Sequence, residues 1–230
     1  MSDHGSLFAT QNAHGFVSAV TSSGLRKTDI TSAEEETVGG PEPPGERVLF
    51  VCTGNRCRSP MAEVLLRAKL APDCGIGVAS AGTVANGEPP PEHAVRVMAV
   101  AGLDIEGRPS RRVDVATLEE ADLIITMAQQ HLVEVVTMNR AALERSFTFV
   151  DLIRRARQVG RPTADESLSQ WAQRLSAGRT PGSILSLAPS DDIVDPMGGS
   201  LNRYKKVAKV LDHLTGELAV RLFGSSSALG

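Results

Sequence analysis

The residues whose types and spacing suggest chemistry lie in one short stretch, where an apolar run, Val48–Val51, ends at Cys52. Arg58 follows in the pattern Cys-x5-Arg, and Ser59 and Pro60 then open a segment with apolar residues at helical spacing. The pattern predicts a strand, a tight loop and the first turn of a helix. Backbone N–H groups of such a loop converge on one point, and the helix dipole adds positive charge there. The loop is therefore expected to bind an anion.

Cys52 and Arg58 are suited to phosphate chemistry within this loop. A helix N-terminus or a nearby cation lowers the pKa of a cysteine from about 8.5 to roughly 3.5–7.5, so we expect Cys52 to be a thiolate at neutral pH. A thiolate beneath a bound phosphate is a nucleophile that forms a cysteinyl-phosphate. Arg58 has a planar guanidinium that can bind two phosphate oxygens. Gly54 and Asn55 tolerate the backbone angles of a tight loop, and Ser59 is placed to cap the helix.

The same chemistry requires a proton donor for the leaving oxygen. Asp195 is the candidate, because Pro196 follows it and favours an extended, rigid backbone. Asp191 and Asp192 are alternatives that lack the adjacent proline. We therefore predict that Asp195 lies across the pocket from Cys52.

Four segments of the chain resemble the low-molecular-weight protein tyrosine phosphatase family. The similarity extends over about residues 46–223 and is most specific in the first and last of these segments, which are Val51–Glu63, Ser80–Thr83, Ala121–Met127 and Asp195–Ser200. The resemblance implies Cys52 as the nucleophile, Arg58 as the phosphate clamp and Asp195 as the general acid. It also implies hydrolysis of phosphate monoesters, by family default of phosphotyrosine in proteins, without a metal or another cofactor.

The resemblance further implies that the other loop residues bind phosphate or support the loop: Thr53, Gly54, Asn55, Arg56, Cys57 and Ser59. The family's second loop cysteine falls at Cys57, which implies a reversible disulfide with Cys52 that protects the nucleophile from over-oxidation. A metal site built from Cys52 and Cys57 is disfavoured, because the sequence has no second Cys or His cluster at suitable spacing. Cys74 is expected to be a free structural thiol.

Departures from the family pattern concern the substrate. Aromatic pocket walls normally follow the Asp-Pro pair and the Ser-Ala-Gly-Thr segment, whereas this chain has Met197 and Val84–Asn86 there. Met197 is accordingly predicted at the substrate rim. Arg56 occupies a loop position that is usually small or apolar. It is either solvent-facing or an added positive charge that favours anionic substrates and disfavours phosphoarginine. These departures keep open a small phosphorylated metabolite, such as a nucleotide, nucleoside phosphate or sugar phosphate, as the substrate.

Two other functions fit parts of the sequence. Arsenate reduction uses a similar loop but needs a relay of thiols, and Cys74 is the only spare cysteine. A binding module that holds phosphorylated ligands without catalysis is disfavoured by the complete set of Cys52, Arg58 and Asp195.

The composition is that of an ordinary globular protein. The chain has 230 residues, of which 41% are hydrophobic and 22% charged, with a net charge of −3. This charge predicts no broad surface for nucleic acid or for an anionic membrane. Three cysteines and the absence of a signal peptide or a long apolar run predict a cytoplasmic protein without membrane spans. The expected partner is the phosphorylated substrate, and an oligomer is left open.

Strand-type and helix-type segments alternate along the chain. Strands are predicted at 47–51, 76–80, 123–126 and 147–150, and helices at 60–71, 90–101, 129–137 and 200–222. The alternation predicts an α/β fold with three layers, α/β/α, around a central four-stranded parallel sheet. The phosphate-binding loop would lie between the first strand and the first helix. Residues 46–224 are predicted to form the domain, with a flexible tail at 1–45 and a short tail at 225–230.

Residues 154–190 form an insert that is longer than the family normally has before the Asp-Pro pair. Thr163 and Glu166 are spaced as a capping box, and the apolar residues that follow fall at helical spacing: Leu168, Trp171, Ala172 and Leu175. Trp171 either docks this extra helix on the domain or belongs to a lid that replaces a missing aromatic wall. The second alternative places Trp171 at the substrate rim.

Overall fold

The computed structural model describes residues 45–184 and 188–223. Apart from Gly45, the predicted tails lie outside the described residues, as do residues 185–187 of the insert. The sheet is parallel, with the strand order β2–β1–β3–β4. Its strands are β1 (Glu46–Cys52), β2 (Ile76–Gly82), β3 (Leu123–Thr126) and β4 (Ser146–Thr148). The four predicted strands and their parallel arrangement are confirmed.

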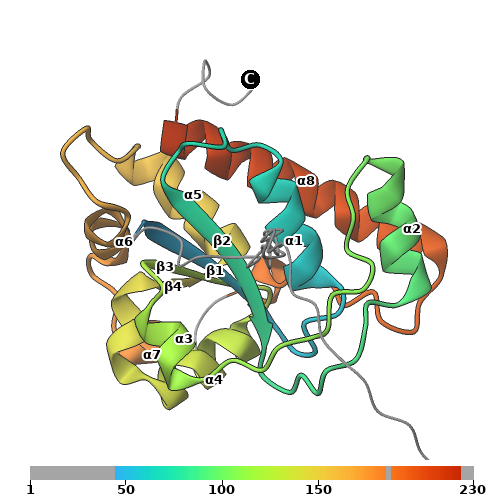
Figure 1. Cartoon of the computed structure of the whole chain (residues 1–230). Coiled ribbons are helices and arrows are strands. Elements are labelled where there is room, and N and C mark those ends of the chain that lie inside the picture. Colours follow the sequence, from blue (N-terminus) through green and yellow to red (C-terminus); the bar gives the residue numbers. More distant parts are fainter. Residues whose placement is uncertain (1–44, 185–187, 224–230) are drawn as a thin grey trace, which may run out of the picture. The chain divides into compact units, whose positions relative to one another are not determined.

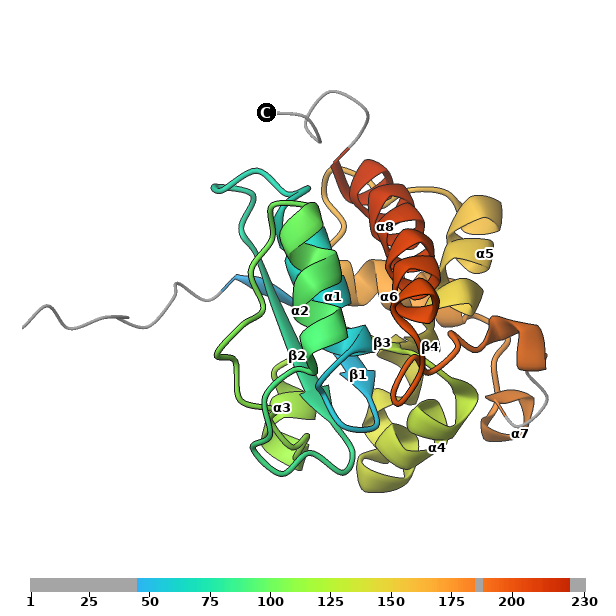
Figure 2. The ribbon, with the colours of Figure 1, turned by 90° about the vertical axis from the view of Figure 1, so that its right-hand side faces the viewer.

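Helices cover both faces of the sheet, as Figures 1 and 2 show. Alternate residues of β1 point to opposite faces, so that Val48 and Phe50 join a large apolar core and Leu49 joins a smaller one. The large core includes residues of α1 (Arg58–Arg67), α2 (Glu92–Val100), α5 (Phe149–Val159), α6 (Leu168–Ser176) and α8 (Leu201–Phe223). The smaller core includes residues of α3 (Val115–Glu119), α4 (Gln129–Met138) and the 3-10 helix η1 (Arg140–Arg145). The predicted three-layer α/β/α fold is confirmed.

The carboxyl ends of the strands meet at one edge of the sheet, because all of them run in the same direction. Backbone hydrogen bonds join the segments that follow the strands at this edge. The N–H of Thr83 donates to the carbonyl of Cys52 over 3.0 Å, and that of Met127 donates to Val51 over 2.9 Å. The N–H of Ile193 donates to Met127 over 2.8 Å. Segments far apart in the sequence are thereby brought together beside Cys52.

Helix α5 was not predicted, and its first residues were assigned to the last strand. The strand ends at Thr148, whose hydroxyl accepts a hydrogen bond from the N–H of Asp151 over 3.4 Å and so caps α5. The apolar residues Phe149 and Val150 begin the helix instead of continuing the strand. A short apolar run does not distinguish the two structures, and the cap decides the boundary.

The extra helix in the insert is confirmed, but its predicted start is wrong. Helix α6 begins at Leu168 and its capping box is formed by Ser167 and Gln170, four residues after the predicted box at Thr163 and Glu166. The carboxylate of Glu166 does accept from the N–H of Thr163 over 3.1 Å, but it also pairs with Arg174 over 2.6 Å and lies before the helix. The short helix α7 (Pro181–Ile184) and the 3-10 turn η2 (Pro189–Asp191) follow.

Trp171 does not lie at the substrate rim, so that prediction is wrong. Its side chain is fully buried in the large apolar core, and its indole N–H donates to the carbonyl of Gly160 over 3.0 Å. The indole therefore docks α6 on the domain, which is the first of the two alternatives raised by the sequence. None of the helices within the described ranges is both long enough and apolar enough to span a bilayer.

Candidate active site

The loop between β1 and α1 has the predicted form. Strand β1 ends at Cys52, α1 begins at Arg58, and the intervening residues turn beside Thr83 and Val84 of the segment after β2. Asn55 has a φ of 50° and is the one residue other than glycine with positive φ among the described residues. Asn55 thus adopts the left-handed backbone conformation that the sequence analysis expected it to tolerate.

The sulfur of Cys52 lies at the start of a chain of buried hydrogen bonds. It is 3.0 Å from the hydroxyl oxygen of Ser59, which accepts a hydrogen bond from the side-chain amide of Asn55 over 3.0 Å. The same amide donates to Ser80 over 2.8 Å, and the hydroxyl of Ser80 donates to Glu63 over 2.6 Å. Because the amide nitrogen only donates, the proton of Ser59 is left for the sulfur of Cys52 or for a nearby carbonyl.

Gly82 is a residue that the sequence reasoning left without a role. A Cβ at this position would lie 2.6 Å from the carbonyl oxygen of Thr53 and 2.7 Å from the backbone nitrogen of Asn55. Only glycine allows the loop to pass so close to the end of β2. The Ser-Ala-Gly-Thr segment was the available signal, since the glycine is its third residue.

Arg58 brings the loop and the candidate acid together. Its side chain is 5% exposed, and one terminal nitrogen donates to Asp195 Oδ2 over 2.5 Å and to Thr53 Oγ1 over 3.3 Å. The other terminal nitrogen donates to the carbonyl of Ile193 over 3.2 Å. Arg58 Nε is buried and has no hydrogen-bond partner within the described part of the chain. This donor is therefore free for an oxygen of a bound anion.

Asp195 is the one of the three candidate acids that contacts Arg58, and it is open to solvent. Its side chain is 46% exposed, and its second oxygen accepts from the N–H of Met197 over 3.0 Å. Asp191 is buried with both oxygens bound by Arg154, and Asp192 accepts from the N–H of Gln129 over 2.7 Å. The two alternatives serve as structural anchors.

His131, in the first turn of α4, was missed by the sequence reasoning. Its side chain is fully buried, and its Nε2 lies 2.8 Å from the hydroxyl of Thr53, which also accepts from Arg58. Burial, with the charge of Arg58 as a second cause, lowers the pKa of His131 to about 4. The imidazole is neutral at pH 7. No local pattern marks this histidine, because its role depends on the packing of α4 behind the loop.

Cys57 is buried behind the loop, where its thiol donates to the hydroxyl oxygen of Tyr204 over 3.8 Å. Burial raises the pKa of Cys57 to about 11, which keeps the sulfur protonated at neutral pH. Both Cys52 and Cys57 are free thiols in the structure. The reversible disulfide between them stays a prediction.

Arg56 lies at the rim, where its charge is compensated. Its guanidinium pairs with the carboxylate of Glu88 and donates to the carbonyl of Pro89 over 2.7 Å. The hypothesis of an added positive charge at the pocket is weakened, since the pair contributes little net charge. The described residues also contain no cluster of three or more His, Cys, Asp or Glu that could hold a metal ion.

The arrangement has the chemical groups that phosphoryl transfer uses. A buried sulfur lies in a loop that leads into a helix N-terminus, and a guanidinium beside it has an unused donor. A carboxyl group on the solvent side contacts the same guanidinium. Hydrolysis of a phosphate ester needs a nucleophile, an oxygen clamp and a proton donor, and these three side chains have the chemistry for such roles.

Comparison with known proteins agrees with this geometry. Residues 47–171 match the family model described as low molecular weight phosphotyrosine protein phosphatase. A protein-arginine-phosphatase of Bacillus subtilis is 27% identical over 178 residues, which cover 76% of this chain and 95% of that protein. An arsenate reductase of Bacillus licheniformis is 42% identical over 80 residues, which cover 35% of this chain and 55% of that protein.

A solved structure gives the same result for the whole domain. The low molecular weight protein tyrosine phosphatase from T. tengcongensis superposes with a TM-score of 0.57 and 31% identity, covering 77% of this chain and 99% of that one. With more than half of the sequence matched by the family model and nearly all of a solved member covered, the chain belongs to the low molecular weight phosphotyrosine protein phosphatase family and is a cysteine-dependent phosphatase.

Proposed function

We propose that Cys52 is the nucleophile, Arg58 the phosphate clamp and Asp195 the general acid of this phosphatase. The observation that supports these roles best is the position of the Arg58 guanidinium. One of its terminal nitrogens contacts both Asp195 and Thr53 of the loop, while Cys52 of the same loop is hydrogen-bonded to Ser59. A phosphate bound there would meet all three groups.

The proposed reaction has two steps. The thiolate of Cys52 attacks phosphorus, the S–P bond forms, and the P–O bond to the leaving group breaks while Asp195 donates its proton to the leaving oxygen. Water then attacks phosphorus, Asp195 accepts the proton of that water, and the S–P bond breaks to release inorganic phosphate. Arg58 and the loop amides stabilise the equatorial oxygens in both steps. A phosphate that also takes the Arg58 nitrogen now bound to Asp195 would free this carboxyl group to face the leaving oxygen.

We further propose a phosphotyrosine side chain on a protein as the substrate. Three exposed aliphatic side chains adjoin the site: Val84, whose N–H donates to Thr53, and Val194 and Met197, which flank Asp195 and Pro196. An aliphatic rim stabilises an apolar ring by burying it, whereas it offers no hydrogen bonds to a sugar, a nucleobase or a guanidinium. The family description and the T. tengcongensis relative point to the same substrate.

The experiment is a comparison of kcat/KM for three substrate classes at equal enzyme concentration. A phosphotyrosine peptide is expected to exceed a phosphoarginine peptide, as well as a panel of nucleotides and sugar phosphates, by more than about tenfold. Cys52→Ser should abolish turnover of every substrate, including a generic aryl phosphate. A preference for a metabolite or for phosphoarginine would overturn the substrate, and unchanged turnover in Cys52→Ser would overturn the mechanism.

Arsenate reduction is disfavoured by the position of the spare thiol. Cys74 precedes β2 at the amino edge of the sheet, while Cys52 ends β1 at the carboxyl edge. The length of β1, about 3.3 Å per residue or roughly 20 Å in total, separates the two edges. Thiol relay between Cys52 and Cys74 would need a large rearrangement, even though an arsenate reductase is among the relatives.

The expected partner is therefore a phosphorylated protein, and the expected compartment is one that keeps thiols reduced. Cys52, Cys57 and Cys74 are all free in the structure, and the proposed nucleophile is active only as a thiolate. A cytoplasmic location would meet this requirement. Recovery of activity with a thiol reductant after mild oxidation would support it.

A further inference from the structure

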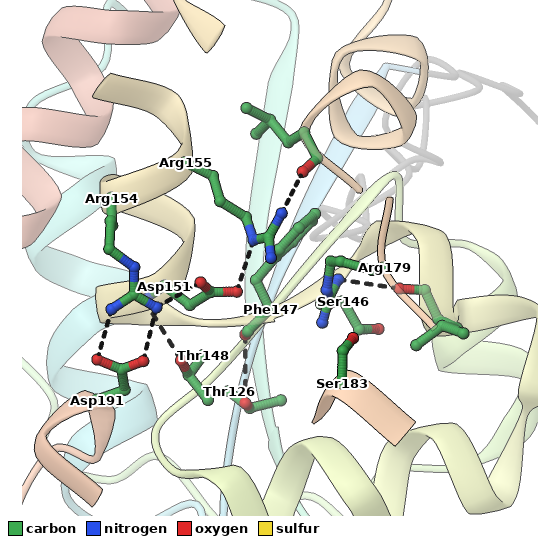
Figure 3. A network of polar contacts seen from close by, with 12 residues as sticks. Thr126, Ser146, Phe147, Thr148, Asp151, Arg154, Arg155, Arg179, Ser183 and Asp191 are labelled. Atoms are coloured by element: carbon green, nitrogen blue, oxygen red, sulfur yellow. Dashed lines mark hydrogen bonds and ion pairs between the residues drawn. The ribbon is translucent and has the colours of Figure 1, made fainter. Parts of the chain in front are cut away.

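Two buried carboxylates and an arginine connect α5 to the segment that leads to Asp195 (Figure 3). Asp151 lies in the first turn of α5 and is 1% exposed, and Asp191 ends η2 and is 2% exposed. Arg154 binds both oxygens of Asp191 over 2.8 Å each, and it donates to Asp151 over 2.6 Å. The hydrogen bond to Asp191 raises the pKa of Arg154, so this arginine stays charged.

Helix α5 is a firm support for this contact. Thr148 caps it directly after β4, and its apolar residues belong to the large core. The second oxygen of Asp151 accepts from Arg155 over 2.9 Å, and Arg155 also donates to the carbonyl of Leu175 in α6 over 3.1 Å. Through Arg155 and Arg154, the carboxylate of Asp151 thus links α6 and η2 to the first turn of α5.

The three residues from Asp191 to Ile193 are attached to three different elements. Asp191 is bound by α5 through Arg154, Asp192 accepts from the N–H that begins α4, and Ile193 donates to Met127 after β3. The carbonyl of Ile193 also accepts from Arg58. Asp195 follows only two residues later, so its position depends on these anchors. Of these three attachments, only the one through Arg154 joins charged groups. Loss of the Arg154 side chain would leave the buried carboxylates of Asp151 and Asp191 without their shared partner.

We propose that Arg154 is a positioning residue for the reaction: by holding Asp191 against α5, it places Asp195 where it can protonate the leaving oxygen. The inference rests on the proposed role of Asp195 as the general acid. The hydrogen bonds of Arg154 go to Asp191 and Asp151, and among the described residues none joins it to Cys52, Arg58 or the phosphate loop. Its loss should therefore affect the proton transfer and leave phosphate binding intact.

The test compares two substrates that differ in their need for a proton. A p-nitrophenyl leaving group departs as a stable anion, whereas a phenyl leaving group needs protonation. Arg154→Ala is expected to lower kcat/KM for phenyl phosphate by at least about tenfold, because this ratio reports the first step, in which the leaving oxygen needs a proton, and general acids contribute about 10²–10⁴-fold. The change with p-nitrophenyl phosphate should stay below about threefold, and the inhibition constant of inorganic phosphate should not change.

Arg157→Ala is the matched control, since it removes another arginine–carboxylate pair of α5. Arg157 pairs with Glu217 on α8, away from the Asp195 segment, and its loss should leave the ratio of the two substrates unchanged. A second control places Arg154→Ala in an Asp195→Ala background. There the arginine should have no further effect on phenyl phosphate, because the group on which it acts is absent.

Equal losses with both substrates, or a further loss in the Asp195→Ala background, would show that Arg154 has a merely structural role. Either result would overturn the inference about Arg154 and leave the proposed role of Asp195 standing. If Asp195→Ala itself spared phenyl phosphate, the role of Asp195 would be wrong, and the inference would fall with it. Should Arg154→Ala fail to fold by circular dichroism, Arg154→Lys keeps the charge but cannot bind both oxygens. It should show the same substrate-dependent loss at smaller amplitude, and wild-type ratios in a folded Arg154→Lys would overturn the proposal.

Discussion

At the scale of single residues, the site depends on backbone contacts that leave no space for a side chain. Gly82 ends β2 directly against Thr53 and Asn55, whose atoms would lie 2.6 Å and 2.7 Å from an added Cβ. Backbone atoms cannot yield as a flexible side chain can, so the phosphate loop itself would have to move. The close approach of Gly82 is thus part of the geometry that fixes the path of the loop backbone.

We expect Gly82→Ala to lower kcat/KM for an aryl phosphate by more than about tenfold, because a displacement of the loop by a fraction of an ångström misaligns the phosphate. Gly216→Ala is the control, since its Cβ would meet only the side chain of Lys69, at 3.6 Å, inside α8. That variant should keep full activity and gain roughly 0.5–1 kcal/mol of unfolding free energy. Full activity in Gly82→Ala would contradict the tight packing of the loop.

At the scale of elements, the extra helix α6 extends the core and does not close over the site. Its capping box is complete. Four of its apolar residues are buried in the large core: Leu168, Trp171, Ala172 and Leu175. Arg155 joins the end of α6 to α5. The insert therefore supports the helix from which Arg154 reaches the Asp195 segment.

Trp171→Ala is expected to lower the free energy of unfolding by about 3–5 kcal/mol, since it removes a fully buried indole and the hydrogen bond to Gly160. The variant should keep the wild-type KM for a phosphotyrosine peptide at temperatures where it remains folded, because Trp171 does not reach the substrate. Denaturant titration and steady-state kinetics measure the two effects. A raised KM without loss of stability would revive the lid hypothesis.

At the scale of the whole molecule, a buried neutral histidine couples folding to pH. Burial lowers the pKa of His131 to about 4 from its usual value of 6.5. The unfolded chain therefore binds more protons than the folded one between these two values. The contribution of neutral His131 to the free energy of unfolding is fully present above pH 6.5 and is lost as the pH falls towards 4. The fold should thus be less stable in mild acid.

Between pH 7 and pH 4.5, His131 alone is expected to cost the wild-type protein roughly 2–3 kcal/mol of unfolding free energy. His131→Gln removes the titration and keeps a polar group for Thr53, so the variant should lose less stability over this range. Denaturant titrations at the two pH values measure the difference. A variant at the exposed His213 serves as the control and should behave as the wild type. Equal pH dependence in His131→Gln would show that His131 does not titrate as described.

The sequence by itself determined the loop, the four strands and the fold class, because these depend on local backbone preferences and on the spacing of apolar residues. Cys52, Arg58 and Ser59 lie within eight residues, so their loop could be predicted from one segment. The start of α5, the start of α6 and the burial of Trp171 depended on caps and packing that a single segment does not contain.

Only the tertiary structure decided which distant groups meet. Asp195 reaches Arg58 across 137 positions of the chain, His131 reaches Thr53 across 78, and Asp191 reaches Arg154 across 37. A parallel sheet gathers the ends of all its strands at one edge, and the packing of helices then sets which side chains come within hydrogen-bond distance. Residue types can indicate the chemistry of a site. The contacts that hold the Asp195 segment, and the distance between Cys74 and Cys52, exist only once the chain has folded.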